Sequence, residues 1–179
     1  PGMDSFAGPA FHTARWDSAV DLKGKRLGLI GTGSTATQIV TATVDMAAEI
    51  KLFQRTAQWV FPVVNTPIPW WKRLWFRLSP EANRRYYYQL QADTAARGKA
   101  AIGDAGQRAA RDEACRRALA TVKDPELRAK LTPDYEPGCK RLVMSDGFHE
   151  AVQKPNVAVI TDRIDHIEPA GIVTSDGKL

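Results

Sequence analysis

The sequence predicts an α/β fold in which a parallel sheet is interrupted by a helical insertion and followed by a small antiparallel β-meander. Residues 26–31 form an apolar segment that ends in glycine, and a helical pattern follows from Ser34 to about Met46. A second apolar strand is expected at residues 49–53. Strand, turn, helix and strand in this order make a β-α-β unit, whose crossover should be right-handed and should join parallel strands.

The helical insertion is predicted after a proline-rich stretch. Pro62, Pro67 and Pro69 fall within residues 61–71, so this segment is expected to be an extended loop. Residues 72–122 are rich in alanine, arginine and aromatic residues at helical spacing, which predicts two or three helices. Breaks in these helices are expected near three glycines: Gly98, Gly103 and Gly106.

The chain then returns to the sheet. Asp124 and Pro125 indicate a helix start, with Asp124 as N-cap, and Ser145 is expected to cap a short helix that ends near Gln153. The tail predicts a strand at 157–160 and then strands at 164–167 and 172–174, with turns at Pro169-Ala-Gly171 and Asp176-Gly177. These elements divide the chain into a linker (1–25), the first part of the sheet domain (26–61), the insertion (62–131) and the return to the sheet domain with the meander (132–179).

Composition excludes several classes of protein. At 179 residues, with 44% hydrophobic and 25% charged residues, the chain suits one globular domain with an insertion. No uninterrupted apolar run reaches membrane-spanning length, and the first residues given lack the basic patch and apolar stretch of a signal peptide, so none is expected here. Cys115 and Cys139 have no metal-ligand spacing, nor do His149 and His166, so no metal site is expected and a reducing, cytoplasmic setting is favoured. The net charge is +5, but the Lys and Arg residues are dispersed among Asp and Glu along the chain. A nucleotide phosphate is therefore expected as the anionic partner, rather than nucleic acid.

The glycine turn after the first strand predicts a dinucleotide site. In the pattern G-x-G-x-x-A, Gly31 allows a sharp turn, Gly33 lets the backbone approach a pyrophosphate, and Ala36 lets the helix pack closely on the strand. The free amides at the helix start would then bind the phosphates. A purely structural tight turn is the alternative. The expected contacts around this helix start are Gly31, Thr32, Gly33, Ser34, Thr35 and Gln38.

The end of the second strand favours NADP over NAD. NAD sites place an acidic residue there to bond the ribose 2'-hydroxyl, whereas this chain has Gln54, Arg55 and Thr56. A guanidinium can pair with a 2'-phosphate, and a neighbouring hydroxyl can add a hydrogen bond. The same position argues against FAD in this turn. The alternative is that Arg55 is simply a solvated side chain at a strand end.

Residues 6–17 carry the most specific pattern in the chain. They read F-x-G-x-x-x-H-x-x-x-W-D, with Phe6, Gly8, His12, Trp16 and Asp17 at the fixed positions. This pattern resembles the fingerprint of type I Baeyer-Villiger monooxygenases, which use NADPH, FAD and oxygen to convert ketones to esters or lactones. The resemblance implies that the histidine couples movement of the cofactor domain to catalysis, and Gly8 is expected to serve a turn. A lone histidine of this kind would more often be structural.

A second resemblance lies in residues 132–141, T-P-D-Y-E-P-G-C-K-R. It is similar to the family's loop between the helical insertion and the returning sheet domain. The resemblance implies that Lys140 joins Arg55 and Thr56 at the NADP 2'-phosphate. It also implies that Arg141 is a mobile active-site arginine that stabilises negatively charged reaction intermediates. Without the surrounding pattern, Lys140 and Arg141 would be read as a solvated pair.

Together these resemblances predict the NADPH-binding region of an FAD-dependent Baeyer-Villiger monooxygenase with a Rossmann-like sheet. Because the chain opens inside the fingerprint, FAD and the small carbonyl substrate are expected to need a flavin domain elsewhere in the same polypeptide, and the isolated chain is not expected to be catalytic. One alternative is a flavin-containing monooxygenase that oxidises nitrogen or sulfur. Another is an NADP-binding module without catalysis.

Residues 70–78 combine aromatic and basic side chains and could form an interfacial membrane helix. Trp71, Leu74, Trp75 and Leu78 recur at helical spacing, so a buried helix face is the preferred interpretation. Part of that face would be exposed if its partner domain were absent.

Overall fold

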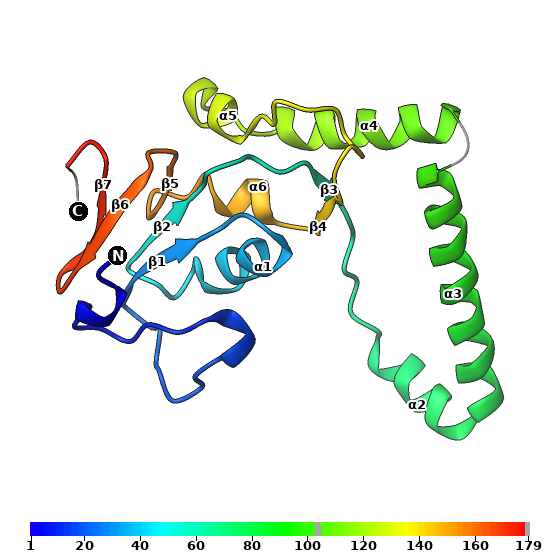
Figure 1. Cartoon of the computed structure of the whole chain (residues 1–179). Coiled ribbons are helices and arrows are strands. Elements are labelled where there is room, and N and C mark those ends of the chain that lie inside the picture. Colours follow the sequence, from blue (N-terminus) through cyan, green and yellow to red (C-terminus); the bar gives the residue numbers. More distant parts are fainter. Residues whose placement is uncertain (103–104, 178–179) are drawn as a thin grey trace.

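The computed structural model describes residues 1–102 and 105–177, and its centre is a three-stranded parallel sheet in the order β1-β2-β5 (Figure 1). The strands are β1 (Arg26–Ile30), β2 (Glu49–Phe53) and β5 (Val157–Ile160). Leu27 lies opposite Ile50 of β2, and Ile50 lies opposite Val157 of β5. The predicted β-α-β unit with parallel strands is therefore confirmed.

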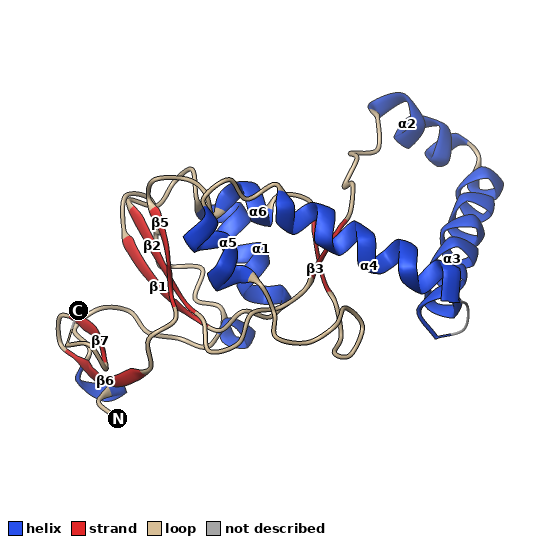
Figure 2. Cartoon of the chain, turned by 90° about the horizontal axis from the view of Figure 1, so that it is seen from above, coloured by secondary structure: helices blue, strands red, loops and turns tan. Residues whose placement is uncertain are grey.

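Helices cover one face of this sheet, and a β-hairpin covers the other (Figure 2). On the helical face lie α1 (Ser34–Thr43) and α6 (Phe148–Ala151). α1 ends at Thr43, three residues before the expected end, and a hydrogen-bonded turn continues to Met46. On the other face, a Cβ added at Gly28 of β1 would lie 3.0 Å from Cδ1 of Ile172, so the hairpin packs closely on that glycine.

The hairpin pairs β6 (Ile164–Glu168) with β7 (Gly171–Thr174) in an antiparallel register. Gly177 donates to the Thr174 carbonyl at 2.8 Å, which confirms the turn expected at Asp176-Gly177. The amino-terminal segment also joins the hairpin, because the Ile167 amide donates to the Pro1 carbonyl at 2.9 Å and the Ala7 amide to the Pro169 carbonyl at 3.1 Å.

A second small parallel sheet was not predicted. It pairs β3 (Val60–Pro62) with β4 (Val143–Ser145). Pro62 is tolerated because it ends an edge strand, so the extended loop begins after it rather than at residue 61. Ser145 ends β4, and its Oγ accepts from the amides of Gly147 and Phe148, at 3.4 and 3.2 Å. Ser145 therefore lies before α6 and binds backbone amides at the start of that helix. The helix ends at Ala151, earlier than the expected end near Gln153.

The first half of the insertion, α2 (Trp70–Leu78) and α3 (Pro80–Ile102), extends away from the sheet in Figure 1, whereas α4 (Ala105–Ala120) and α5 (Pro125–Leu131) lie over it. The Asp124 carboxylate accepts from the Glu126 amide at 2.9 Å, so the predicted N-cap of α5 is confirmed. The expected break at Gly98 is wrong, because α3 continues through it. The break expected near Gly106 is confirmed, since α4 begins next to it at Ala105, while Gly103 is outside the described residues. A single glycine costs a helix only about 1 kcal/mol, which alanine-rich neighbours can offset.

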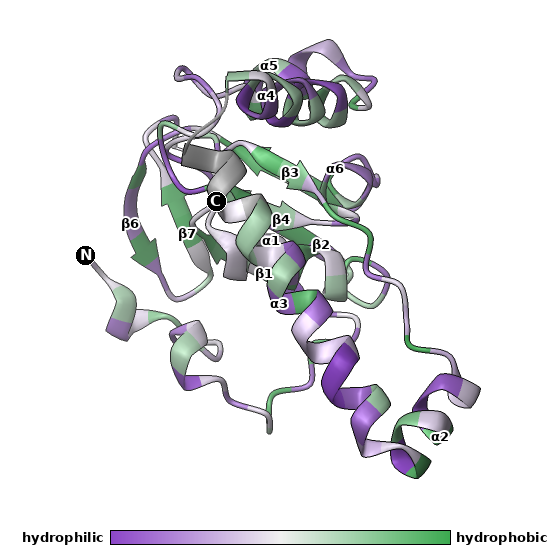
Figure 3. Ribbon diagram, turned by 90° about the vertical axis from the view of Figure 1, so that its right-hand side faces the viewer, coloured by the Kyte–Doolittle hydropathy of each residue, from purple (hydrophilic) through white to green (hydrophobic). Residues whose placement is uncertain are grey.

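The preferred interpretation of a buried face on α2 is also wrong for the described part of the chain. Trp70 is 75% exposed and Leu78 76% exposed, and α2 contains no buried residue. It packs on α3 through the Phe76 ring, which stacks on Tyr86 at 5.2 Å, and through Lys72, whose Nζ lies 3.8 Å from the Tyr86 ring centroid. Much of α3 is hydrophilic (Figure 3). This helix therefore does not offer α2 a large apolar surface to pack against. No described helix has the length and apolar character needed to span a bilayer.

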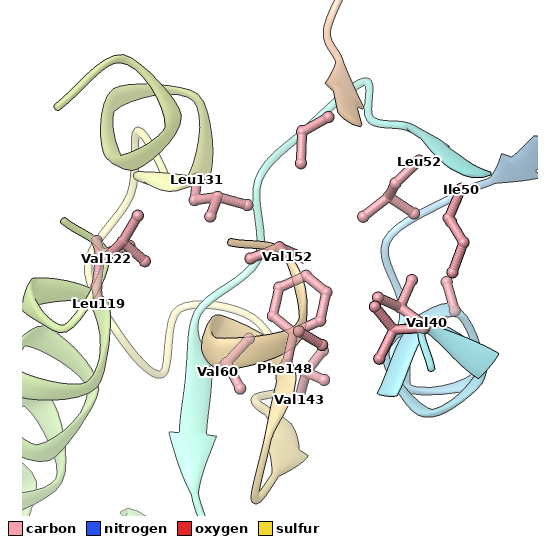
Figure 4. Packing of buried hydrophobic residues seen from close by; sticks show 14 of the residues in the cluster. Val40, Ile50, Leu52, Val60, Leu119, Val122, Leu131, Val143, Phe148 and Val152 are labelled. Carbon is pink, nitrogen blue, oxygen red and sulfur yellow. The ribbon is translucent and has the colours of Figure 1, made fainter. Parts of the chain in front are cut away.

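One hydrophobic core joins the sheet to the second half of the insertion (Figure 4). Val40 of α1 packs beside Ile50 and Leu52 of β2, while Val122 and Leu131 enter from the opposite side. Residues of α6 and its C-cap, β3 and β4 fill the space between them: Phe148, Val152, Val60 and Val143. α4 and α5 are therefore anchored to the sheet, whereas α2 and α3 reach outward.

The two cysteines should differ sharply in reactivity. Cys115 is fully buried in this core, and burial, helped by Asp112, raises the pKa of its thiol to about 11. Cys139 is exposed. We expect Ellman's reagent at pH 8 to modify Cys139 rapidly and Cys115 only after unfolding, because the thiolate is the reactive form. Cys139→Ser should remove the rapid phase, and rapid modification that persists in this folded variant would contradict the prediction.

Candidate functional site

The glycine turn leaves open space above the first strand. Gly31 has φ of +112°, a conformation that strains other residues, and its amide donates to the Phe53 carbonyl of β2 at 3.0 Å. A Cβ added at Gly31 or Gly33 would meet no atom within 4 Å. A ligand can therefore approach this backbone closely, as the sequence pattern predicts.

The start of α1 faces this space with unpaired backbone donors. Gly33 is the N-cap, and no described side chain caps the helix. The carbonyl of Gly33 instead accepts from Thr37, through its amide at 3.1 Å and its hydroxyl at 3.2 Å. The first-turn amides and the positive end of the helix dipole favour an anion. Ser34, Thr35 and Gln38 are exposed around it.

The end of β2 lies beside the glycine turn. The Thr32 hydroxyl donates to the Thr56 carbonyl at 2.9 Å, which joins the two segments directly. Arg55 is exposed next to this contact. Gln54, in contrast, is only 5% exposed and donates to the Lys130 carbonyl at 2.6 Å, so its side chain anchors α5. The structure thus brings the turn together with Arg55 and Thr56 and assigns Gln54 a structural role.

The loop 132–141 is held against the same segment by Tyr135. Its hydroxyl lies 3.2 Å from the Ala57 carbonyl and 3.1 Å from Oε1 of Gln58, and its own carbonyl accepts from Nε1 of Trp59 at 2.5 Å. The exposed Lys140 ammonium lies 4.2 Å from the centroid of the Tyr135 ring. Lys140 is therefore tied to the chain just after Arg55, by a cation–π contact that adds to the tyrosine's hydrogen bonds.

His12 and Arg141 remain apart from these contacts. Nδ1 of His12 accepts from the Ala14 amide at 3.1 Å and caps the short 3-10 helix Thr13–Arg15. Arg141 is exposed two residues before β4. No hydrogen bond or ion pair joins His12 to Arg141 in the part of the chain that the structure describes.

The rest of the residue 6–17 pattern makes local contacts. Trp16 is 46% exposed and packs edge-on against Phe11, with ring centroids 5.3 Å apart. Gly8 lies within a bend, and a Cβ there would be 2.8 Å from the Phe6 ring. A larger residue at this position would therefore displace the Phe6 ring. Among the described residues, no group of three His, Cys, Asp or Glu side chains is placed to hold a metal ion.

Two residues were missed from the sequence as parts of the site. The Tyr135 ring makes the cation–π contact with Lys140, and Arg111 of α4 donates to the Pro137 carbonyl in the same loop at 3.0 Å. Nothing local to Arg111 in the sequence distinguishes it from other arginines of the insertion. Gly138 was the available signal, because a glycine in a loop often marks a close approach of another group.

Comparison with known proteins places this geometry in a family. The profile of the flavin-binding monooxygenase-like family matches residues 1–79. An uncharacterized monooxygenase of Mycobacterium tuberculosis is 46% identical over 181 residues, covering 99% of this chain and 36% of the relative. A Baeyer-Villiger monooxygenase of Streptomyces coelicolor is 38% identical over 183 residues, covering 99% of this chain and 34% of the relative. These matches show that the chain corresponds to a segment of flavin monooxygenases of the Baeyer-Villiger type.

Solved structures agree with this placement. Cyclohexanone monooxygenase from a Rhodococcus species, bound to NADP+, superimposes with a TM-score of 0.77 at 28% identity, covering all of this chain and 41% of that one. The enzyme OTEMO in complex with FAD and NADP gives a TM-score of 0.76 at 25% identity, covering 99% of this chain and 41% of that one. The predicted α/β fold, with its parallel sheet, helices and small antiparallel sheet, is confirmed. This Baeyer-Villiger-type chain spans about a third of the length of the curated relatives it matches.

Proposed function

We propose that this chain forms the NADPH-binding region of an FAD-dependent Baeyer-Villiger monooxygenase that converts ketones to esters or lactones with oxygen. The observation that carries the proposal is the hydrogen bond from Thr32 to Thr56. It brings an open glycine turn next to Arg55, so that one dinucleotide can contact both. The NADP-bound structure of a related cyclohexanone monooxygenase supports the same cofactor.

In this proposal, the pyrophosphate binds over Gly31 and Gly33 at the start of α1, where free amides and the helix dipole stabilise its charge. The adenosine 2'-phosphate binds at the end of β2, where Arg55 pairs with it, Thr56 follows, and Lys140 lies over Tyr135, which bonds to Ala57. An acidic residue would repel this phosphate, and Gln54, Arg55 and Thr56 place none there. The site therefore selects NADPH over NADH.

Arg141 and His12 belong to the catalytic part of the proposal. A guanidinium remains charged at any working pH, so Arg141 would stabilise negative charge developing near the reacting atoms without losing its proton. His12 would couple movement of the cofactor domain to the reaction. FAD, held by a flavin domain outside these residues, would supply the oxygen-activating chemistry. The 179 residues alone would bind NADPH without oxidising a ketone.

Two alternatives differ in measurable ways. A relative that oxidises nitrogen or sulfur would act on amines or sulfides instead of ketones when the longer polypeptide is assayed. A non-catalytic NADP-binding module would bind NADPH, yet no longer form of the protein would consume it with oxygen. The Phe6–Asp17 pattern, with its Trp-Asp ending, favours the Baeyer-Villiger reaction over both.

Fluorescence titration of the purified chain with NADPH and, in parallel, NADH tests the cofactor assignment. We expect NADPH to bind at least about tenfold more tightly, a difference of about 1.4 kcal/mol. Circular dichroism of the same sample shows whether the chain is folded. A folded chain that binds both nucleotides equally, or neither, would contradict the proposed NADPH site.

A further inference from the structure

Arg111 links the helical insertion to the loop that carries Lys140. Its side chain, in α4, is 16% exposed and pairs with Asp112, whose Oδ1 lies 2.7 Å from Nη2. The same Nη2 donates to the Pro137 carbonyl at 3.0 Å. A guanidinium can hold a carboxylate and a carbonyl at once because its donors form a rigid fork. Through Arg111, α4 is thereby hydrogen-bonded to the loop at Pro137, three residues before Lys140.

Gly138 shows how closely the two groups approach. It has φ of +87°, and a Cβ added there would lie 2.5 to 2.6 Å from three atoms of the Arg111 guanidinium. No side chain can occupy that space unless Arg111 moves. The loop backbone thus lies directly against the guanidinium.

The loop is fixed on its other side by Tyr135, which contacts Ala57 and Gln58 after the end of β2. Arg116 of α4 adds an ion pair with Glu136, but these side chains are 48% and 73% exposed, so this pair is weak. Arg111 is the more buried of the two arginine contacts. Residues 135–138 are therefore held between the insertion and the sheet, and Lys140 follows immediately.

We propose that Arg111 is a positioning residue for NADPH recognition: it holds the loop at Pro137 and Gly138 so that Lys140 stays beside Arg55 at the 2'-phosphate. The inference rests on the proposed function, since it assigns Lys140 to that phosphate. It gives the helical insertion a role in cofactor choice without requiring Arg111 to touch the nucleotide.

The test is a double-mutant cycle on the purified chain, read as the ratio of NADH to NADPH dissociation constants. We expect Arg111→Gln to reduce the preference for NADPH about fivefold, and to change it by less than about twofold when Lys140 is already alanine. Arg111→Lys keeps the charge but loses the fork, so its preference should lie between those of the wild type and Arg111→Gln. Gly138→Ala, which displaces the guanidinium from the loop side, should have the same effect as Arg111→Gln.

Arg117→Gln is the matched control, because Arg117 lies on the same helix, is 72% exposed and pairs with Glu113 in the part of the chain that the structure describes. Arg117→Gln should leave the preference for NADPH unchanged. Equal losses of NADPH and NADH binding in Arg111→Gln, or full additivity with Lys140→Ala, would overturn the inference. So would an unchanged preference in Lys140→Ala, which would leave the phosphate to Arg55. A wild-type chain without any NADPH preference would instead overturn the proposed function.

Discussion

Replacing Arg55 with alanine should weaken NADPH binding by about 10- to 100-fold and leave NADH binding nearly unchanged. The side chain is exposed at the end of β2, beside the Thr32–Thr56 hydrogen bond. A hydrogen bond to a charged group contributes about 1.5 to 3 kcal/mol, and only NADPH carries the 2'-phosphate that would receive it. Parallel fluorescence titrations with the two nucleotides measure the change.

Arg84→Ala provides the control for loss of one positive charge. Arg84 lies on α3 with its side chain 68% exposed and pairs with Glu81 in the same helix. Its removal should not alter the affinity for either nucleotide. A comparable loss of NADPH and NADH affinity in Arg55→Ala would contradict the 2'-phosphate assignment, because that loss would reflect damage to the whole site.

Leu52→Ala should lower the free energy of unfolding by about 2 to 5 kcal/mol. Leu52 is fully buried in β2, the central strand of the sheet, and packs in the core with Ile50 and Val40 (Figure 4). Truncation leaves a cavity that neighbours on both sides of the strand cannot fill, since the parallel pairing fixes their positions. Urea unfolding followed by circular dichroism measures the loss.

Leu78→Ala is the same substitution on an exposed site, because Leu78 ends α2 with 76% of its surface exposed. It should change the free energy of unfolding by no more than about 0.5 kcal/mol. An equal loss in the free energy of unfolding for the two alanine variants would contradict this prediction. It would mean that Leu52 does not lie in the core, or that α2 packs against the sheet and its core.

Local signals in the sequence were sufficient where the physics is local. The apolar strand, the glycine turn and the helix after it predicted a β-α-β unit, and β1, α1 and β2 formed within a few residues of the expected limits. Asp124 before Pro125 predicted a helix cap, because the cap bond joins groups two residues apart. The positive φ at Gly31 likewise follows from a requirement of the turn itself.

Contacts between distant segments were not predictable from those signals. The β3–β4 pair joins residues more than 80 positions apart, and three-residue strands have too short a pattern to recognise. The helical spacing of Trp71, Leu74 and Trp75 predicted a buried face, yet the fold places α2 on a projecting arm. Periodicity shows that one side of a helix is apolar, but only the tertiary arrangement decides what covers it.

The candidate site divides in the same way. By itself, the sequence determined the kind of fold, the glycine turn and the basic residue at the end of β2, because each depends on residue type at short spacing. Only the tertiary structure decided that Thr32 bonds to Thr56, that Tyr135 holds Lys140 nearby, and that Arg111 supports their loop. The Thr32–Thr56 and Arg111–Pro137 contacts, and the bond from Tyr135 to Ala57, join segments separated by tens of residues, and their geometry is set by the packing of α4 and the sheet around one core.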